Sequence, residues 1–350
     1  MAVVMRLPRR RFLQTTAGAG ALSFLPSVAS SQVYPTHPVR LLVGFPPGGG
    51  SDVGARIIAN RLSEVWGQQV FVENKPGAGG HLAIDVAAHA NPDGYTIIWV
   101  GGSIPLYGLM IKSINYDPEA DLAAVTLVGT YPNLLAVPNL SPWKSVQDLI
   151  AAAKAKPGTV TFSSPGVGTS PHLTGVLFAR MSGIDIRHVP YRGGAPALAD
   201  LIAGHVDCMF NTAGTLLGAV TSGQVRGLAV TSAKRFAATP ELPTIAESGV
   251  PGFDVTSWYA LYMPAKTAAL IVQKVSHDVA EILSEPAVRS KYEQLGILSG
   301  GSTPTELAAR GRSEAKLWRS VMEAAGIQQS KSRTAILMSA LGQKQTFTRV

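Results

Sequence analysis

Two glycine-rich segments carry the residue types that bind an anion through the backbone. The first follows an apolar run, residues 39–45, and reads PPGGGSD before an amphipathic helical pattern begins. Glycines let the backbone come close to a ligand, and a helix N-terminus presents unpaired N–H donors and the positive end of its dipole. We therefore predict an anion-binding loop between a strand and a helix, with Asp52 as the N-cap of that helix.

The second segment, SSPGVGTSPH at residues 163–172, repeats this chemistry and adds serine and threonine hydroxyls. Hydrogen bonds to a charged group contribute about 1.5–3 kcal/mol each. Micromolar affinity corresponds to about 8 kcal/mol, so a handful of such donors suffices without a cationic side chain. His172 is interpreted either as a ligand donor or as a packing residue of the helix start.

Other chemistries find little support in the sequence. The glycines of the first loop are followed by no Gly-Lys-Ser/Thr and form no Gly-x-Gly-x-x-Gly, which argues against a nucleotide-phosphate loop. The seven histidines are scattered, without the spacing of metal ligands, so we expect neither a metal nor a cofactor. Gly-x-Ser-x-Gly is absent. An exported serine-dependent hydrolase that pairs a loop serine with His172 is kept as the enzymatic alternative.

The first 31 residues are predicted to be a signal peptide rather than part of the fold. Four arginines precede a weakly apolar segment, residues 15–25, and the sequence SVAS at residues 27–30 offers a cleavage site. The segment RRRFLQ at residues 9–14 resembles the twin-arginine export motif, with Pro8 in place of the usual Ser or Thr. An ordinary secretory signal is the alternative, and either route predicts export.

The formal net charge of +8 comes from the two ends of the chain. The signal segment and residues 331–350 each hold four basic residues and no acid, so residues 32–330 are neutral. The charge therefore gives no support to nucleic-acid binding. Residues 331–350 continue no earlier pattern and are predicted to be a loosely ordered tail.

Strand-like and helix-like segments alternate along the rest of the chain, which predicts an α/β fold with mainly parallel sheets. The single Cys208 lies in an apolar run and is expected to be buried, and no internal disulfide can form. After the first strand and helix, the expected strands are 69–73, 95–100, 159–163, 187–191, 206–210 and 226–230. The expected helices are 81–90, 141–156, 171–181, 194–203, 266–284 and 304–325.

Two extended, apolar and aromatic stretches, residues 127–137 and 257–263, are expected to cross between two lobes. Residues 33–131 and 257–328 would form lobe 1, and residues 132–256 would form lobe 2. Two crossings make a hinge, and both glycine loops lie at the carboxyl ends of strands, where α/β proteins bind ligands. Lobe closure would bring the two helix N-termini toward one ligand.

Several short segments occur in an order and spacing that is typical of one family. They are YPTHPVR at 34–40, FPPGGGSD at 45–52, NKPGAGG at 74–80, NPDGY at 91–95, SSPGVGTSPHL at 163–173, PYRGG at 190–194 and AAGI at 324–327. Together they resemble the tripartite tricarboxylate transporter substrate-binding proteins, also called Bug receptors. The resemblance covers about residues 34–328.

The resemblance implies a two-lobed periplasmic-binding-protein fold of type II, the Venus flytrap, and a location in the periplasm. It implies a monomeric receptor, not an enzyme, that captures a small organic carboxylate. The receptor would deliver this ligand to the large and small membrane permease subunits of a tripartite transporter. A ligand sensor that signals without transport would share every sequence feature, and this alternative stays open.

In that family the ligand carboxylate is held by the two loops that match residues 45–52 and 163–172. The regions that match Ala78-Gly79 and the loop after 206–210 line the cleft. Whether the ligand is a monocarboxylate, a dicarboxylate, an aromatic acid or a neutral amide stays open. The expected ligand-binding residues are Phe45, Pro47, Gly48, Gly49, Gly50, Ser51, Asp52, Ala78, Gly79, Ser163, Ser164, Gly168, Thr169, Ser170, His172, Asn211 and Thr212.

A few other side chains near these segments have two interpretations. Trp258 and Tyr259 are interpreted as core residues, with cleft lining as the alternative. Arg56 is expected on a helix surface, and Arg192 is expected to brace the loops.

Overall fold

The computed structural model describes residues 34–102, 104–107 and 114–324. Its strands form one mixed sheet in the order β2-β1-β3-β9-β4-β7-β5-β6, and β8 and β10 each pair with β4. The expectation of mainly parallel sheets was wrong, because every pair that β4 or β9 makes is antiparallel. Apolar runs show that a strand is buried but do not show the direction of its neighbour.

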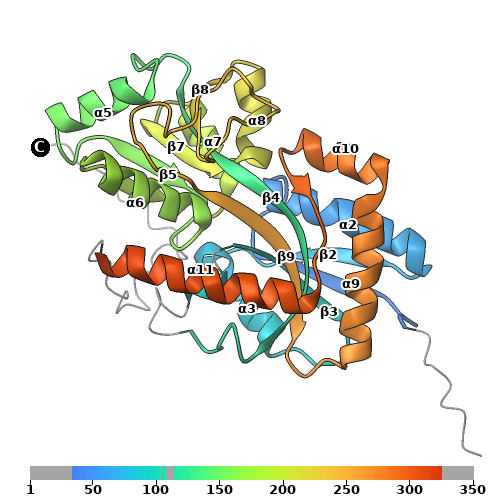
Figure 1. Cartoon of the computed structure of the whole chain (residues 1–350). Helices are drawn as coiled ribbons and strands as arrows, with labels where there is room; N and C mark the ends of the chain where they lie inside the picture. Colours follow the sequence, from blue (N-terminus) through green and yellow to red (C-terminus); the bar gives the residue numbers. More distant parts are fainter. Residues whose placement is uncertain (1–33, 103, 108–113, 325–350) are drawn as a thin grey trace, which may run out of the picture. The chain divides into compact units, whose positions relative to one another are not determined.

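Strand β4 (Leu122–Pro138) is long enough to belong to two half-sheets, one along each part of its length (Figure 1). The first half-sheet consists of β1 (Val39–Val43), β2 (Val70–Asn74), β3 (Thr96–Gly101), β9 (Thr256–Pro264), β10 (Leu298–Ser299) and residues 122–132 of β4. The second half-sheet consists of β5 (Thr161–Ser164), β6 (Arg187–Pro190), β7 (Cys208–Thr212), β8 (Val225–Val230) and residues 133–138 of β4.

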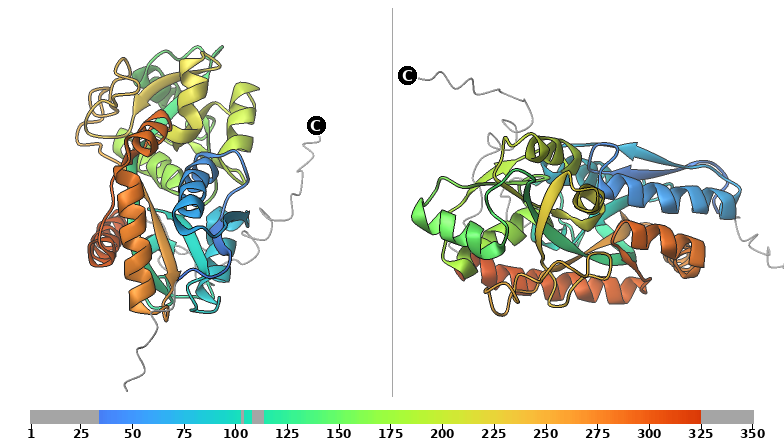
Figure 2. Two further views of the ribbon diagram at one scale, coloured as in Figure 1. Left: turned by 90° about the vertical axis from the view of Figure 1, so that its right-hand side faces the viewer. Right: turned by 90° about the horizontal axis from the view of Figure 1, so that it is seen from above.

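Helices join and cover the strands of both half-sheets, and α5 and α9 lie at opposite ends in the two turned views (Figure 2). Around the first half-sheet are α2 (Gly50–Trp66), η2 (Ala78–Gly80), α3 (His81–Ala88), η3 (Ile104–Leu106), α9 (Ala269–Ser284), α10 (Pro286–Gln294) and α11 (Pro304–Ala324). Around the second are α5 (Val146–Ala155), α6 (Ser170–Ser182), α7 (Gly194–Ile202) and α8 (Ala213–Thr221).

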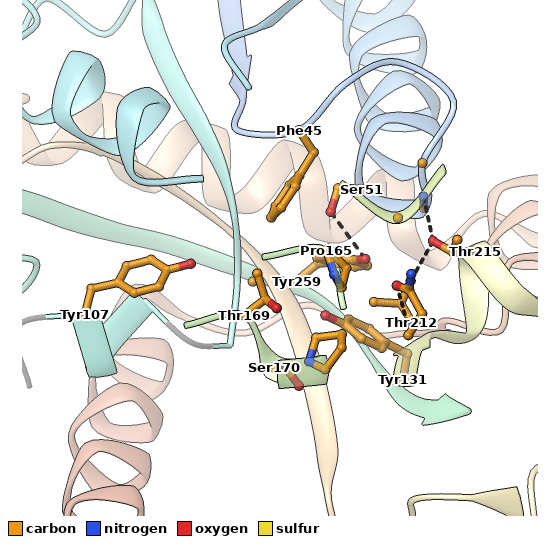
Figure 3. A pocket seen from close by; sticks show the side chains of 16 residues that line it. Phe45, Ser51, Tyr107, Tyr131, Pro165, Thr169, Ser170, Thr212, Thr215 and Tyr259 are labelled. Atoms are coloured by element: carbon orange, nitrogen blue, oxygen red, sulfur yellow. Dashed lines mark hydrogen bonds between the residues drawn. The ribbon is translucent and has the colours of Figure 1, made fainter. Parts of the chain in front are cut away.

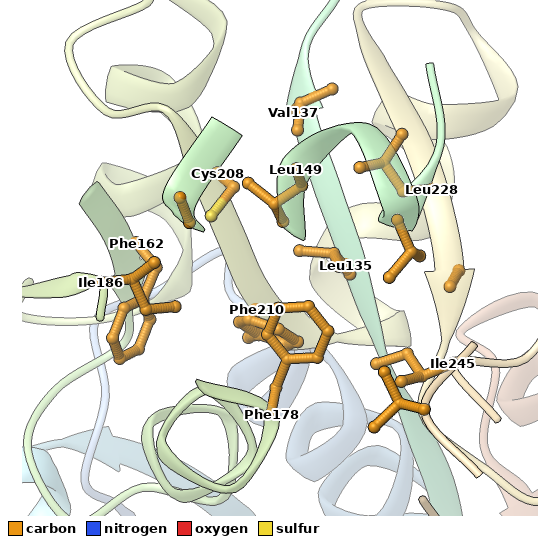
Figure 4. Packing of buried hydrophobic residues seen from close by; sticks show 14 of the residues in the cluster. Leu135, Val137, Leu149, Phe162, Phe178, Ile186, Cys208, Phe210, Leu228 and Ile245 are labelled. Carbon is orange, nitrogen blue, oxygen red and sulfur yellow. The ribbon is translucent and has the colours of Figure 1, made fainter. Parts of the chain in front are cut away.

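The core of the second half-sheet is built on both of its faces. In β4, Leu135 and Val137 pack into one apolar cluster, and Leu134 and Ala136 pack into the cluster on the other face. A strand buried on both faces has a continuous apolar sequence, which explains the run LLAV. Phe178 of α6 and Phe210 of β7 lie side by side with ring centroids 5.5 Å apart (Figure 4).

Cys208 is a buried free cysteine in this core, as expected. Side-chain caps mark the starts of two helices. Ser145 accepts from the N–H of Asp148 and begins α5, later in the chain than the predicted start at residue 141. Thr303 accepts from the N–H of Glu306 and begins α11. These caps give the chain local signals for where a helix begins.

Two helices, α8 and α10, were not expected from the sequence. The α8 sequence, AGTLLGAVT, contains two glycines and β-branched residues, which lower intrinsic helix propensity. The α10 sequence, PAVRSKYEQ, is mostly polar and shows little apolar periodicity. Tertiary packing decides both helices, because Leu216 and Ala219 of α8 and Val288 and Tyr292 of α10 are buried.

Three expectations fall outside the described residues. These are the signal peptide at residues 1–31, the tail at residues 331–350 and the end of the last expected helix at residue 325. None of the described helices combines the length and the apolar character that crossing a membrane requires.

Candidate anion-binding site

The first glycine loop turns from β1 into α2, and Gly49 is the N-cap of this helix with an extended backbone (φ −82°, ψ 163°). The prediction that Asp52 is the N-cap was wrong, because the helix begins two residues before it, at Gly50. The Asp52 carboxylate instead accepts the N–H of Gly48 at 3.0 Å. Gly48 has a φ of +85°, which lets the loop fold back onto the helix.

Asp52 is almost fully buried, and its carboxylate holds the first loop together. Arg56 forms an ion pair with it at 2.9 Å, and Asn74 at the end of β2 donates to Oδ1 at 2.8 Å. Burial raises the pKa of Asp52, but the hydrogen bonds it accepts and the charge of Arg56 outweigh this effect, so the pKa lies below its usual value. The carboxylate is therefore occupied by the loop.

The second glycine loop turns from β5 into α6, with Thr169 as the N-cap. Thr169 Oγ1 donates to the carbonyl oxygen of Gly166 at 2.7 Å and closes the turn. Pro171 occupies the first turn of α6, where its missing N–H costs nothing. The second glycine loop therefore leads directly into the N-terminus of α6.

Two half-buried histidines, His172 and His188, brace this second loop. His172 Nδ1 accepts the N–H of Gly168 at 3.2 Å, and its ring lies 4.2 Å from the ring of His188. His188 Nε2 is 2.7 Å from the hydroxyl of Ser164. Burial lowers the pKa of His172 to about 4 and that of His188, which also faces His172, to about 2. Both rings are therefore neutral near pH 7 and act as hydrogen-bonding supports.

A third group of donors comes from β7 and the start of α8. Asn211 and Thr212 are the last two residues of β7, whereas the prediction placed them after the strand. Asn211 Oδ1 accepts the N–H of Thr212 at 2.8 Å, which turns its Nδ2 away. This Nδ2 is buried and has no hydrogen-bond partner within the described parts of the chain. Gly50 donates its N–H to Thr215 Oγ1 at 3.4 Å and so joins α2 to α8.

These three groups surround one small cavity (Figure 3). The N-terminal ends of α2, α6, α7 and α8 all reach it, and none of the described side chains that line it is charged. The lining residues are Phe45, Gly49, Gly50, Ser51, Gly101, Tyr107, Tyr131, Pro165, Thr169, Ser170, Pro171, Gly194, Asn211, Thr212, Thr215 and Tyr259. Four converging helix dipoles make this cavity favourable for an anion.

Aromatic side chains form the rest of the wall. Tyr131 of β4 and Tyr259 of β9 have ring centroids 4.3 Å apart, and Ser51 donates to the Tyr259 hydroxyl at 3.4 Å. Tyr107 donates to the carbonyl oxygen of Gly79 at 3.0 Å, and its hydroxyl points toward the other labelled side chains in Figure 3. Burial raises the pKa of Tyr131 and of Tyr259, so both hydroxyls stay protonated.

The structure brings about half of the expected ligand-binding residues to the cavity wall. Those that line it are Phe45, Gly49, Gly50, Ser51, Thr169, Ser170, Asn211 and Thr212. Those that lie outside its wall are Pro47, Gly48, Asp52, Ala78, Gly79, Ser163, Ser164, Gly168 and His172. Ser163 is fully buried within β5. Several residues outside the wall, such as Asp52 and His172, form hydrogen bonds that hold the loops on which the wall residues lie.

Part of the wall was not expected from the sequence, namely Gly101, Tyr107, Tyr131, Pro165, Pro171, Gly194 and Thr215, and cleft lining was only the alternative for Tyr259. Successive side chains of a strand point to opposite faces of the sheet. This alternation could have indicated that Tyr259 and Trp258 lie on different faces of β9. Trp258 points to the opposite side of β9 and donates to Glu314 Oε1 of α11 at 2.7 Å. Thr215 lies on α8, which was not expected as a helix, so its place at a helix start carried no signal.

A second cavity lies beside α11 and is larger, about 490 Å³ against about 40 Å³ for the first. Its wall includes both signs of charge, with Asp117 and Glu119 facing Arg312 and Arg319. Neither glycine loop contributes to it. Within residues 34–102, 104–107 and 114–324, no three His, Cys, Asp or Glu side chains gather as metal ligands would. The smaller cavity is therefore the better candidate for an anion.

Comparison with known proteins connects this geometry to a family. The model of the tripartite tricarboxylate transporter family receptor matches residues 54–324. BugT of Bordetella pertussis is 35% identical over 299 residues, which cover 85% of this chain and 92% of BugT.

Two solved structures resemble the whole described fold. An R. palustris protein with adipate is 36% identical with a TM-score of 0.83, over 85% of this chain and 100% of that chain. The periplasmic binding protein BugD is 30% identical with a TM-score of 0.82, over 85% of this chain and 100% of that chain. These similarities confirm the expected two-lobed periplasmic-binding-protein fold.

Proposed function

The chain belongs to the tripartite tricarboxylate transporter receptor family, and on that premise we propose that its uncharged cavity binds the carboxylate of a small organic acid. Members of this family are solute-binding receptors and not enzymes. The observation that carries the proposal is the unpaired Nδ2 of Asn211 in a cavity where four helices begin. A buried donor without a partner is costly unless a ligand supplies an acceptor.

The donors come from both half-sheets. The α2 start follows β1 of the first half-sheet, and the α6, α7 and α8 starts follow β5, β6 and β7 of the second. We propose that residues 33–131 and 257–328 form lobe 1 and residues 132–256 form lobe 2, with β4 and β9 as the crossings. Only closure of the lobes completes the donor set, so a carboxylate shifts the population toward the closed form.

We also propose that the receptor works in the periplasm and delivers its ligand to a tripartite transporter in the membrane. The family model and the likeness to a periplasmic binding protein support this role. The hydrolase alternative is not proposed, because its histidine, His172, accepts a backbone N–H through Nδ1 and lies outside the cavity wall.

A thermal-shift screen tests the proposal. The purified protein is heated with adipate, benzoate, nicotinate or other small acids, and glucose is the neutral control. A ligand at about 100 times its Kd stabilises the folded state by about 2.7 kcal/mol, so a binding acid raises the Tm by several degrees. If no acid in a broad panel shifts the Tm, the proposed function is wrong.

A pair of variants on one helix tests the place of binding. Ser170→Val removes a hydroxyl from the cavity wall at the start of α6, and Ser182→Val makes the same change at the other end of this helix. We expect Ser170→Val to weaken binding of the best acid by about tenfold, the value of one hydrogen bond to a charged group. Ser182→Val should leave the affinity unchanged, and equal affinities in both variants would count against the cavity.

A further inference from the structure

Asn133 is a fully buried amide of β4 that contacts the start of α6 from behind the cavity. Its Nδ2 donates to Ser170 Oγ at 3.1 Å and to Thr174 Oγ1 at 2.9 Å. Asn133 does not line the cavity, but Ser170 does. The Asn133 amide can therefore determine whether the Ser170 hydroxyl donates or accepts a hydrogen bond in the cavity.

Thr174 fixes which way this amide faces. The Thr174 hydroxyl donates to the carbonyl oxygen of Ser170 at 2.8 Å, as threonines in helices often do. A hydroxyl has one proton, so Thr174 Oγ1 is left only as an acceptor toward Asn133. An amide turned by 180° would place Asn133 Oδ1 against an oxygen with no proton to give. The NH₂ group of Asn133 therefore faces Thr174 and, with it, Ser170.

The Ser170 hydroxyl becomes a donor as a result. Its oxygen accepts an N–H from Asn133, so its own proton is free to point into the cavity that Ser170 lines. Asn211 is oriented in the same sense, because its Oδ1 accepts the N–H of Thr212 and its buried Nδ2 is the unpaired atom. Ser170 and Asn211 thus present donors to the cavity, whereas Thr169 and Tyr107 give their hydroxyl protons to backbone carbonyl oxygens and can only accept.

We propose that Asn133 is a specificity-determining residue that makes this cavity select a carboxylate over the matching carboxamide. Both oxygens of a carboxylate only accept hydrogen bonds, so they match donors from Ser170 and Asn211. A carboxamide has the same shape but brings an NH₂ group, which leaves a donor facing a donor in a buried site. This inference rests on the proposed function and decides between the acid and amide ligands that the sequence leaves open.

Matched pairs of acid and amide test the inference by isothermal titration calorimetry. The pairs are benzoate and benzamide, nicotinate and nicotinamide, and adipate and adipamide. For each pair in which the acid binds, we expect the acid to bind at least about 30-fold more tightly than its amide. Affinities within about threefold would overturn the inference and leave carboxylate binding intact. If no acid binds, the proposed function fails and this inference fails with it.

Asn133→Asp is the decisive variant. An aspartate has the same shape but accepts the Ser170 proton, so Ser170 loses its role as donor to the ligand. We expect the preference for acid over amide to fall by about tenfold or more. Asn139→Asp makes the same change at an exposed position near the end of the same strand and should leave the preference unchanged. An unchanged preference in Asn133→Asp would contradict the assignment.

Thr174→Val keeps the test independent of a new buried charge. This change removes the hydroxyl that orients Asn133, at a residue that does not itself line the cavity. The freed amide can then either donate to Ser170 or accept from it, so the acid preference should fall in a variant that keeps its thermal transition. A folded Thr174→Val protein that keeps the full preference of the wild type for acid over amide would show that Asn133 does not decide whether the Ser170 hydroxyl donates or accepts.

Discussion

The backbone of Gly79 lies against the carbonyl oxygen of Val167, so close that a Cβ added to Gly79 would stand 2.4 Å from that oxygen. Gly79 belongs to η2, which follows β2 of the first half-sheet, and Val167 belongs to the loop that precedes α6 of the second. Gly79 also has a φ of +67°, in the left-handed region. Glycine is the residue type that permits this contact between the two parts of the proposed cleft.

Gly79→Ala should weaken ligand binding by about tenfold or more, because the new methyl group prevents the approach that completes the donor set. Gly67→Ala is the matched control, since Gly67 has a φ of +62° and open space around its Cβ position. Both variants should lose about 1 kcal/mol of stability from the left-handed backbone. Calorimetric titration with the best acid separates them, and equal affinities would show that the contact between Gly79 and Val167 is unimportant.

Asp52→Asn should destabilise the fold by about 1–2 kcal/mol, because half-exposed Arg56 loses its partner and an NH₂ group faces other donors. The pKa of Asp52 is lowered in the folded state, so its contribution is present above the unfolded pKa and is lost as the pH falls through the folded one. Urea unfolding at pH 7 measures the change. Asp185→Asn, at an exposed carboxylate, is the control, and an equal loss in both would argue against the loop-bracing role of Asp52.

The half-buried histidines of the second glycine loop predict that stability falls in mild acid. His172 has a pKa of about 4 in the folded protein against an ordinary value of 6.5. Between these pH values the unfolded state binds more protons, so the free energy of unfolding decreases as the pH is lowered, by up to about 3 kcal/mol for this residue alone. Urea unfolding at pH 7, 5.5 and 4.5 should show this slope.

His172→Asn should reduce that slope, while His277→Asn, at an exposed position, should not. The same slope in His172→Asn and the wild type would mean that His172 is not the group that resists protonation. His188 faces His172 and would then be examined in the same way.

The Cys208 thiol should be inert in the native protein. Cys208 of β7 is fully buried in the core of the second half-sheet beside β5, and burial raises the pKa of its thiol. A thiol reagent such as Ellman's should therefore label it only at the rate of unfolding, with the rate rising steeply in urea. Rapid labelling in buffer would show that this part of the core opens readily.

Much of the fold could be predicted from the sequence because strong local signals mark it. Thr303 with Glu306 and Ser145 with Asp148 are capping pairs, and the runs of β1, β3 and β4 are mostly apolar. The helix α8 was missed because its own sequence is a poor helix former and tertiary packing supplies its stability. Pairing direction was missed because an apolar strand looks the same in either direction.

The part of the candidate site that the two glycine loops form was predicted, and the part that the strands form was not. Glycines followed by Ser or Thr mark the two loops, so Gly50, Ser51, Thr169 and Ser170 were found before the fold was known. Tyr131 reaches the cavity only because β4 passes beside β9, a long-range relation that no local pattern shows. Residues that brace the loops, such as Asp52, have the same chemistry as residues that bind ligands, so the sequence alone does not separate the two roles.

The central claim is that the carboxylate binds in an uncharged cavity at the start of four helices. A crystal structure of the protein with the best acid of the screen tests it most directly. We predict one carboxylate within hydrogen-bond distance of Asn211 Nδ2 and Ser170 Oγ, with both half-sheets contributing donors. A carboxylate bound elsewhere, such as beside Arg312 and Arg319 in the larger cavity, would contradict the account.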